Sequence, residues 1–179
     1  QSQGYCTQVP PFKYTNLTVL KGSFFAGSIT PNGWNWVPYE LESVTNMNSA
    51  FNYCSKLVQT TQESETFPQL KTSSALTNLK NVFYNSGIKG WITEGGAASS
   101  QPFINTTNVT DWSGAFAFNS ITSLTVDTQS AITLSGTFQD NNWVTSPYFN
   151  APNCTSFSSI FKDCDQMTTM NPSIANSTY

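Results

Sequence analysis

One pattern of apolar and polar positions recurs along the chain. Each copy has eight positions. In the pattern, positions 1 and 4 are apolar, position 2 is Thr or a small polar residue, position 6 is Ser, Gly or Asn, position 7 is small, position 8 is Phe, and positions 3 and 5 take any residue. Apolar side chains thus stand at positions 1, 4 and 8. The closing phenylalanines are 27, 32, 33, 22 and 23 residues apart, and the copies span residues 17–24, 44–51, 76–83, 109–116, 131–138 and 154–161. Six copies in one register predict a repeat protein.

The spacing also predicts local structure within each repeat. Apolar residues at positions 1, 4 and 8 fit one face of a short helical turn. Five or six residues after each Phe comes another apolar residue, which predicts a short strand; these are Ile29, Leu57, Ile88, Ile121, Trp143 and Met167. Upstream of most copies lies a Pro followed by an aromatic or aliphatic residue, as in Pro38-Tyr39, whereas the fifth copy has Leu124-Thr125-Val126, which alternates as a strand does.

Each repeat is too small to bury its own apolar face, so the repeats are expected to stack and to bury it together. The expected core is a ladder of Phe24, Phe51, Phe83, Phe116, Phe138 and Phe161. The predicted fold class is a leucine-rich-repeat-like solenoid of about six degenerate repeats, with short parallel strands and short helical or irregular segments. Residues 1–10 form an N-terminal segment, 11–170 a single solenoid domain and 171–179 an incomplete terminal repeat.

The segment VTNMNSAFNYCSKL at 44–57 resembles the BspA-like leucine-rich repeat of bacterial surface proteins and mycoplasma lipoproteins, and 108–116 and 157–167 are similar. Cys54 and Cys164 stand where that repeat has its Cys, three residues after the Phe, whereas Asn85, Asn119 and Asn141 stand at or near it in other copies. The resemblance implies a solenoid with a cell-surface or extracellular role in binding or adhesion, and it implies no catalysis.

Composition narrows the function further. The chain has no Arg, no His, seven Lys and a net charge of −3, which argues against nucleic-acid binding because that needs clustered cations. Ser, Thr and Asn make up about a third of the residues, but the 25 aromatic side chains argue against disorder. No apolar run reaches the roughly 18 residues of a membrane span. Without His, the commonest general base near pH 7 is missing, so no enzyme activity, cofactor or metal is expected.

Two features favour an extracellular location. N-glycosylation sequons occur at Asn16, Asn105, Asn108, Asn153 and Asn176. The four cysteines, Cys6, Cys54, Cys154 and Cys164, lack zinc-site spacing and favour two disulfides over buried free thiols. A local Cys154–Cys164 bridge with Cys6–Cys54 is the favoured pairing, and an intermolecular bond is the alternative.

Other polar and aromatic clusters have simpler interpretations. The carboxylate pairs Glu40/Glu42, Glu63/Glu65 and Asp163/Asp165 suit a weak Ca²⁺ site or a glycosidase pair, but solvated loops explain them better. Gly33-Trp34-Asn35-Trp36 suits sugar stacking, with packing or capping as the simpler interpretation.

The ends of the chain suggest self-assembly. Residues 172–176 open a further unit that stops before its motif, and neither end carries an obvious polar cap. We therefore expect a glycosylated structural protein that stacks head to tail into an extracellular or cell-surface filament, its partners being copies of itself and covalent glycans. The alternative is a monomeric cell-surface adhesion or ligand-binding module.

Overall fold

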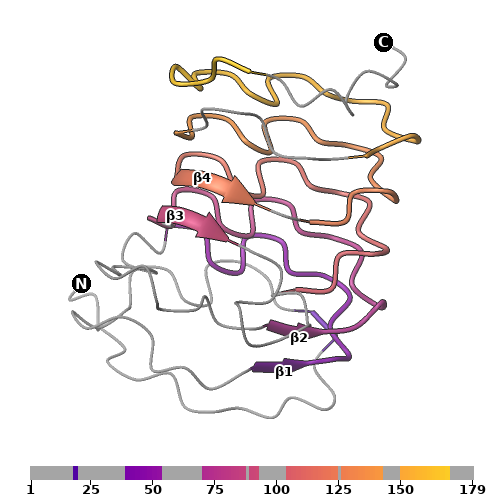
Figure 1. Cartoon of the computed structure of the whole chain (residues 1–179). Helices are drawn as coiled ribbons and strands as arrows, with labels where there is room; N and C mark the ends of the chain where they lie inside the picture. Colours follow the sequence, from indigo (N-terminus) through magenta and orange to yellow (C-terminus); the bar gives the residue numbers. More distant parts are fainter. Residues whose placement is uncertain are drawn as a thin grey trace, which may run out of the picture.

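The computed structural model describes residues 18–19, 39–53, 70–87, 89–92, 104–124, 126–142 and 150–169. Its strands are β1 (Tyr39–Leu41), β2 (Leu70–Thr72), β3 (Lys89–Ile92) and β4 (Ser120–Leu124). β1 pairs in parallel with β2, and β3 with β4. The described chain climbs through successive layers from β1 to the last motif copy, which lies uppermost in Figure 1.

The strands flank the motif on both sides. β3 and β4 lie downstream of the Phe, in the region where a strand was expected, and Ile121 lies within β4. β1 and β2 lie upstream, beside the Pro-containing flanks, where the sequence pattern did not predict strands. Val126 of the expected Leu124-Thr125-Val126 strand lies just beyond β4 and is buried.

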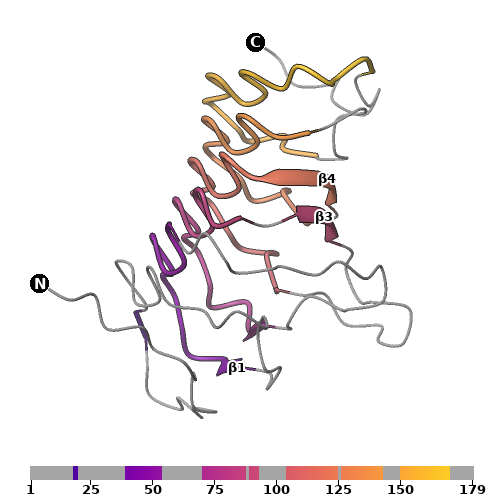
Figure 2. The same ribbon diagram turned by 90° about the vertical axis from the view of Figure 1, so that its left-hand side faces the viewer.

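A column of parallel single-residue bridges joins the motif copies. Position 3 of each copy pairs with position 3 of the next, through Val19, Asn46, Asn78, Asp111, Thr133 and Ser156. The copies pair position by position although their spacing along the chain varies from 22 to 33 residues. The additional residues of the longer repeats therefore lie outside the motif, and the motif turns form one regular edge of the stack (Figure 2).

The motif itself is a run of turns. The described residues contain no helix, so in these copies the motif takes the irregular and not the helical of the two forms expected for it. In the third copy the Val82 N–H bonds to the Leu79 carbonyl and the Tyr84 N–H to the Asn81 carbonyl, each three residues back. We continue the numbering past the Phe, so that positions 9, 10 and 11 are the three residues after it. The backbone φ is positive at positions 6 and 10, being 51° at Asn81 and 50° at Asn85. Asn81 is the third residue of the Leu79–Val82 turn, where a positive φ fits type II, and a positive φ at either position interrupts a right-handed helix.

Backbone N–H groups of the motif point to the next layer. Positions 4, 6, 8 and 10 of one copy donate to the carbonyls of positions 3, 5, 7 and 9 of the following copy. In the third copy these bonds are 2.8–2.9 Å long, and the same four recur at each of the other junctions from the second copy to the sixth. In the opposite direction, the Thr77 N–H and hydroxyl both donate to the Thr45 carbonyl of the preceding layer.

Side chains at positions 1, 4, 7 and 8 face the interior. The described phenylalanines of the ladder stack in sequence, with ring centroids 5.1 Å apart for Phe51–Phe83, 5.7 Å for Phe83–Phe116, 6.3 Å for Phe116–Phe138 and 5.7 Å for Phe138–Phe161. The rings from Phe51 to Phe138 are at most 1% exposed, whereas Phe161 is half-buried. Phe24 lies outside the described residues.

The ladder predicts a graded loss of stability along the stack. Phe116→Ala removes a fully enclosed ring with neighbours on both sides, and we expect it to lower the free energy of unfolding by about 3–5 kcal/mol. Phe161→Ala is the matched control and should cost clearly less, because its ring is half-buried. Urea unfolding measures both. Equal losses would contradict the ladder as the core.

Candidate functional site

Position 11, three residues after the Phe, holds a column of buried polar side chains. Ser86, Asn119, Asn141 and Cys164 occupy it in the third to sixth copies, and all are at most 8% exposed. The sequence resemblance marks this position as a Cys, and Cys54 of the second copy lies outside the described residues. At this position Asn and Cys share one contact, a hydrogen bond to a backbone carbonyl of the preceding layer.

The two asparagines bind backbone carbonyls in two layers. The Asn141 Nδ2 donates to the Phe116 carbonyl of the preceding layer at 2.8 Å, and to the carbonyls of Phe138 and Gln139 in its own layer at 3.2 and 3.1 Å. Its Oδ1 accepts from the Ile121 N–H at 3.1 Å. Asn119 repeats the arrangement one layer earlier. Buried carbonyls need such donors, so these amides serve the fold.

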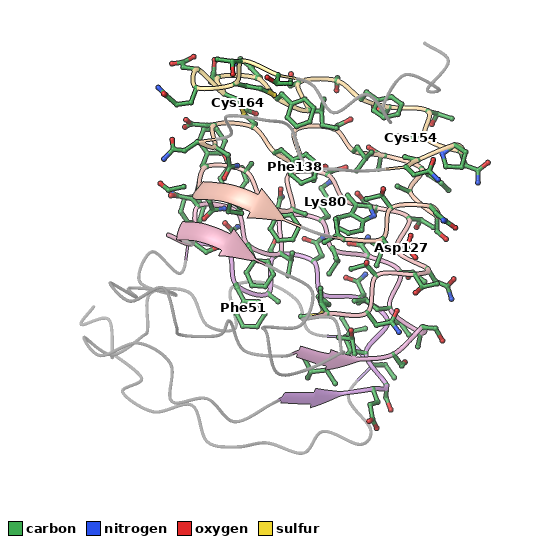
Figure 3. The ribbon with its side chains drawn as sticks, in the orientation of Figure 1. Phe51, Lys80, Asp127, Phe138, Cys154 and Cys164 are labelled. Atoms are coloured by element: carbon green, nitrogen blue, oxygen red, sulfur yellow. The ribbon has the colours of Figure 1, made fainter. Side chains whose placement is uncertain are left out.

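Cys164 takes the same place with a thiol. Its Sγ donates to the Phe138 carbonyl of the preceding layer at 3.1 Å. Cys154 occupies position 1 instead, and its Sγ donates to the Ser156 carbonyl at 3.3 Å. The two sulfurs lie at opposite sides of the uppermost layer (Figure 3).

The expected Cys154–Cys164 bridge is absent from the structure, where both residues are free thiols. Positions 1 and 11 of one copy are held apart by the intervening turns, so closeness in sequence does not bring the two sulfurs together. Cys6 and Cys54 lie outside the described residues. Burial raises the pKa of both described thiols, which favours the protonated form, and only the thiolate is a strong nucleophile.

The sequons fall on a repeated turn. Asn108 and Asn153 each stand immediately before position 1 of a motif copy, and both are exposed. Asn105 is half-buried, and its Oδ1 accepts from the Thr107 N–H at 3.2 Å. Asn16 and Asn176 lie outside the described residues.

The repeat itself gives these sequons a structural origin. The Asn108 Nδ2 donates to the Ser74 carbonyl of the preceding layer, and the Ser130 hydroxyl makes the equivalent bond to the Thr107 carbonyl one layer later. The sequon Thr is position 2, where the Thr110 hydroxyl donates to the Thr77 carbonyl. The Asn and Thr of the 108–110 triplet therefore also serve the packing between layers. A glycan replaces one Nδ2 hydrogen and leaves the other free to donate, so attachment is compatible with the bond.

The last described layer differs from the inner ones in burial. Cys154, Phe157, Ile160, Phe161 and Met167 pack against the core but stay partly exposed. In the inner layers the residues at positions 1, 4, 7 and 8 are at most 1% exposed. The last layer therefore presents a partly exposed apolar surface, called the end face here and defined by Phe157, Ile160 and Phe161.

The structure describes the remaining clusters only in part. Asp163 and Asp165 are both exposed, while Glu63/Glu65 and Gly33–Trp36 lie outside the described residues, as does the Glu40 side chain. Among the described residues no group of three or more His, Cys, Asp or Glu could hold a metal ion. The same residues contain no helix long and apolar enough to cross a membrane.

The position-11 column predicts a difference between two substitutions at Asn141. Asn141→Asp keeps the shape but replaces the donor with an acceptor, and at neutral pH with a buried charge, against three carbonyl oxygens. We expect it to cost about 3 kcal/mol or more in unfolding free energy. Asn141→Cys should be tolerated better because Cys164 makes the equivalent bond in the next layer. The two unfolding midpoints in urea decide this, and a milder effect of Asp than of Cys would refute it.

Comparisons of the chain with protein-family models, with curated proteins and with solved structures found no match.

Proposed function

We propose that this protein is a secreted, glycosylated structural subunit that stacks head to tail into an extracellular or cell-surface filament. In this proposal the chain is a leucine-rich-repeat-like solenoid, and its partner is a second copy of itself. The observation that carries it is the end face, where Phe157, Ile160 and Phe161 are half-buried although their counterparts in the inner layers are enclosed.

The direction of the backbone ladder supports a head-to-tail contact. At each described junction from the second copy to the sixth, the N–H groups of positions 4, 6, 8 and 10 of the lower copy face the C-terminal side of the stack, and the carbonyls of positions 3, 5, 7 and 9 of the upper copy face the N-terminal side. Position 2 donates in the opposite direction, so the two sides of a layer carry different patterns of donors and acceptors, and each side complements the opposite side and not itself. Such a heterologous contact, if it does not close into a ring, propagates into a filament.

Composition and sequon placement support the extracellular part of the proposal. Only 9% of residues are charged, whereas Ser, Thr and Asn make up about a third of the chain. The exposed Asn108 and Asn153 occupy equivalent turns at the side of the stack, so glycans there would leave the end face uncovered. Sugars on the sides and apolar residues on the end would together restrict the addition of subunits to the long axis of the stack.

Electron microscopy of a matched pair of variants tests the assembly. Ile160→Glu places a charge on the end face, and we expect filaments to disappear, because burying an unpaired charge between subunits is costly. Ile132→Glu is the control, since Ile132 is 50% exposed at position 2, on the side of the stack, and should leave filaments intact.

Two outcomes would contradict the proposal. One is a wild-type chain that stays monodisperse at high concentration, and the other is an Ile160→Glu chain that polymerises like the wild type.

Glycan attachment is tested in the same preparation, because enzymatic release of N-glycans converts each occupied Asn to Asp. Peptide mass spectrometry is expected to find that conversion at Asn108 and Asn153.

The alternative function is a monomeric adhesion or ligand-binding module on the cell surface. The observation favouring it is an aromatic side chain directed to solvent, Tyr53, which is 55% exposed. Large exposed aromatic groups are a common feature of binding surfaces. A monodisperse chain in the microscopy test would favour this alternative.

A further inference from the structure

Three aromatic side chains from successive layers contact one another on the motif edge of the stack. The Tyr53 and Tyr84 rings meet edge to face with centroids 5.7 Å apart, and the Tyr84 and Phe118 rings are tilted with centroids 4.9 Å apart. Tyr53 is exposed, and the other two are half-buried. We call these three residues the aromatic strip. With layers roughly 4.8 Å apart, it runs about 10 Å along the stack.

Two members of the strip stand in a backbone conformation that disfavours them. Tyr53 and Phe118 occupy position 10 with φ of 56° and 58°. The same position holds Asn85, Asp140 and Asp163 in the other described copies, and Asn and Asp tolerate positive φ far better than bulky residues do. Backbone strain of this kind gathers at binding sites, so the choice of aromatic residues here points to a ligand.

The surroundings of the strip indicate what the ligand is. Positions 9 and 10 of the second to fourth copies carry only the three rings, Ala117 and the carboxamides of Asn52 and Asn85. In the fifth and sixth copies the same positions carry Gln139, Asp140, Lys162 and Asp163, with Lys162 Nζ 3.7 Å from Asp163 Oδ2. The charged residues therefore begin where the rings end.

Uncharged ring faces beside the exposed Asn85 carboxamide match a neutral sugar chain. The C–H faces of pyranose rings pack on aromatic rings, and sugar hydroxyls both donate and accept hydrogen bonds, as carboxamides do. An anionic glycan is disfavoured by Asp140 and Asp163 at the end of the strip. The strip is also too small and narrow for a stable protein interface, which needs roughly 800 Å² on each partner.

We propose that the aromatic strip binds a neutral oligosaccharide or polysaccharide whose chain runs along the stack, across the second, third and fourth layers. Tyr53 supplies the most exposed ring, Tyr84 joins the other two, and Phe118 ends the site before the charged layers. This site is on the side of the stack and does not rest on head-to-tail assembly.

Affinity gel electrophoresis of the full chain tests the proposal. The gels contain soluble mixed-linkage β-glucan, galactomannan or xylan as neutral probes, and alginate as an anionic one. We expect at least one neutral polysaccharide to slow the wild-type chain. The double variant Tyr53→Asn, Phe118→Asn should lose the retardation while its Tm is unchanged or raised, because Asn suits the positive φ at both positions. Ile132→Asn removes an exposed apolar side chain elsewhere and should migrate as the wild type does.

A ring-preserving variant guards against a purely structural effect. Tyr53→Phe keeps the ring face and is expected to keep the retardation. Loss of retardation in this variant at unchanged Tm would overturn the proposal. So would retention by the double variant, absence of retardation in every neutral gel, or retardation by alginate alone. Because Tyr53 and Phe118 lie away from the end face, filaments can persist when this proposal fails, and the reverse also holds.

Discussion

The backbone N–H groups of positions 4, 6, 8 and 10 donate to the next layer, and the rest of the described structure depends on these bonds. Four such bonds join each of the described layers from the second copy onward, and they hold only if the chain turns at positions 6 and 10. The turns in turn place positions 1, 4, 7 and 8 inside, where the Phe rings stack. The aromatic core and the polar backbone thus repeat with the same layer spacing.

The sequence predicted which residues would be equivalent, but not how the motif folds. Position 3 pairs with position 3 in all six copies because a shared register is a property of the pattern itself. In the described copies the motif is irregular and not helical, because a run of tight turns also produces the spacing 1, 4, 8. Gly114 and Gly136 at position 6, with Asn81 in another copy, were the available signal, since these residues favour positive φ. At Gly114 any Cβ would also collide with the Asn81 side chain.

The candidate sites were predicted less well, because their residue types serve more than one purpose. Cys154 and Cys164 suggested a disulfide, yet each thiol is a donor to a backbone carbonyl. Asn108 and Thr110 suggested a glycan site, yet both side chains also hydrogen-bond to the preceding layer. In the aromatic strip, Tyr53 and Phe118 occupy position 10 of their copies, whereas Tyr84 occupies position 9. An alignment of the motifs therefore does not reveal that the three rings are in contact. Only the stacking brings them together.

The central claim is that motif N–H groups bond to the next layer and not within a helix. Nuclear magnetic resonance couplings transmitted across hydrogen bonds test this directly in the third copy. We predict a coupling between the amide nitrogen of Phe83 and the carbonyl carbon of Ala115, which are joined by a 2.9 Å bond. A coupling from Phe83 to the carbonyl carbon of Leu79, four residues back as in an α-helix, would contradict the account.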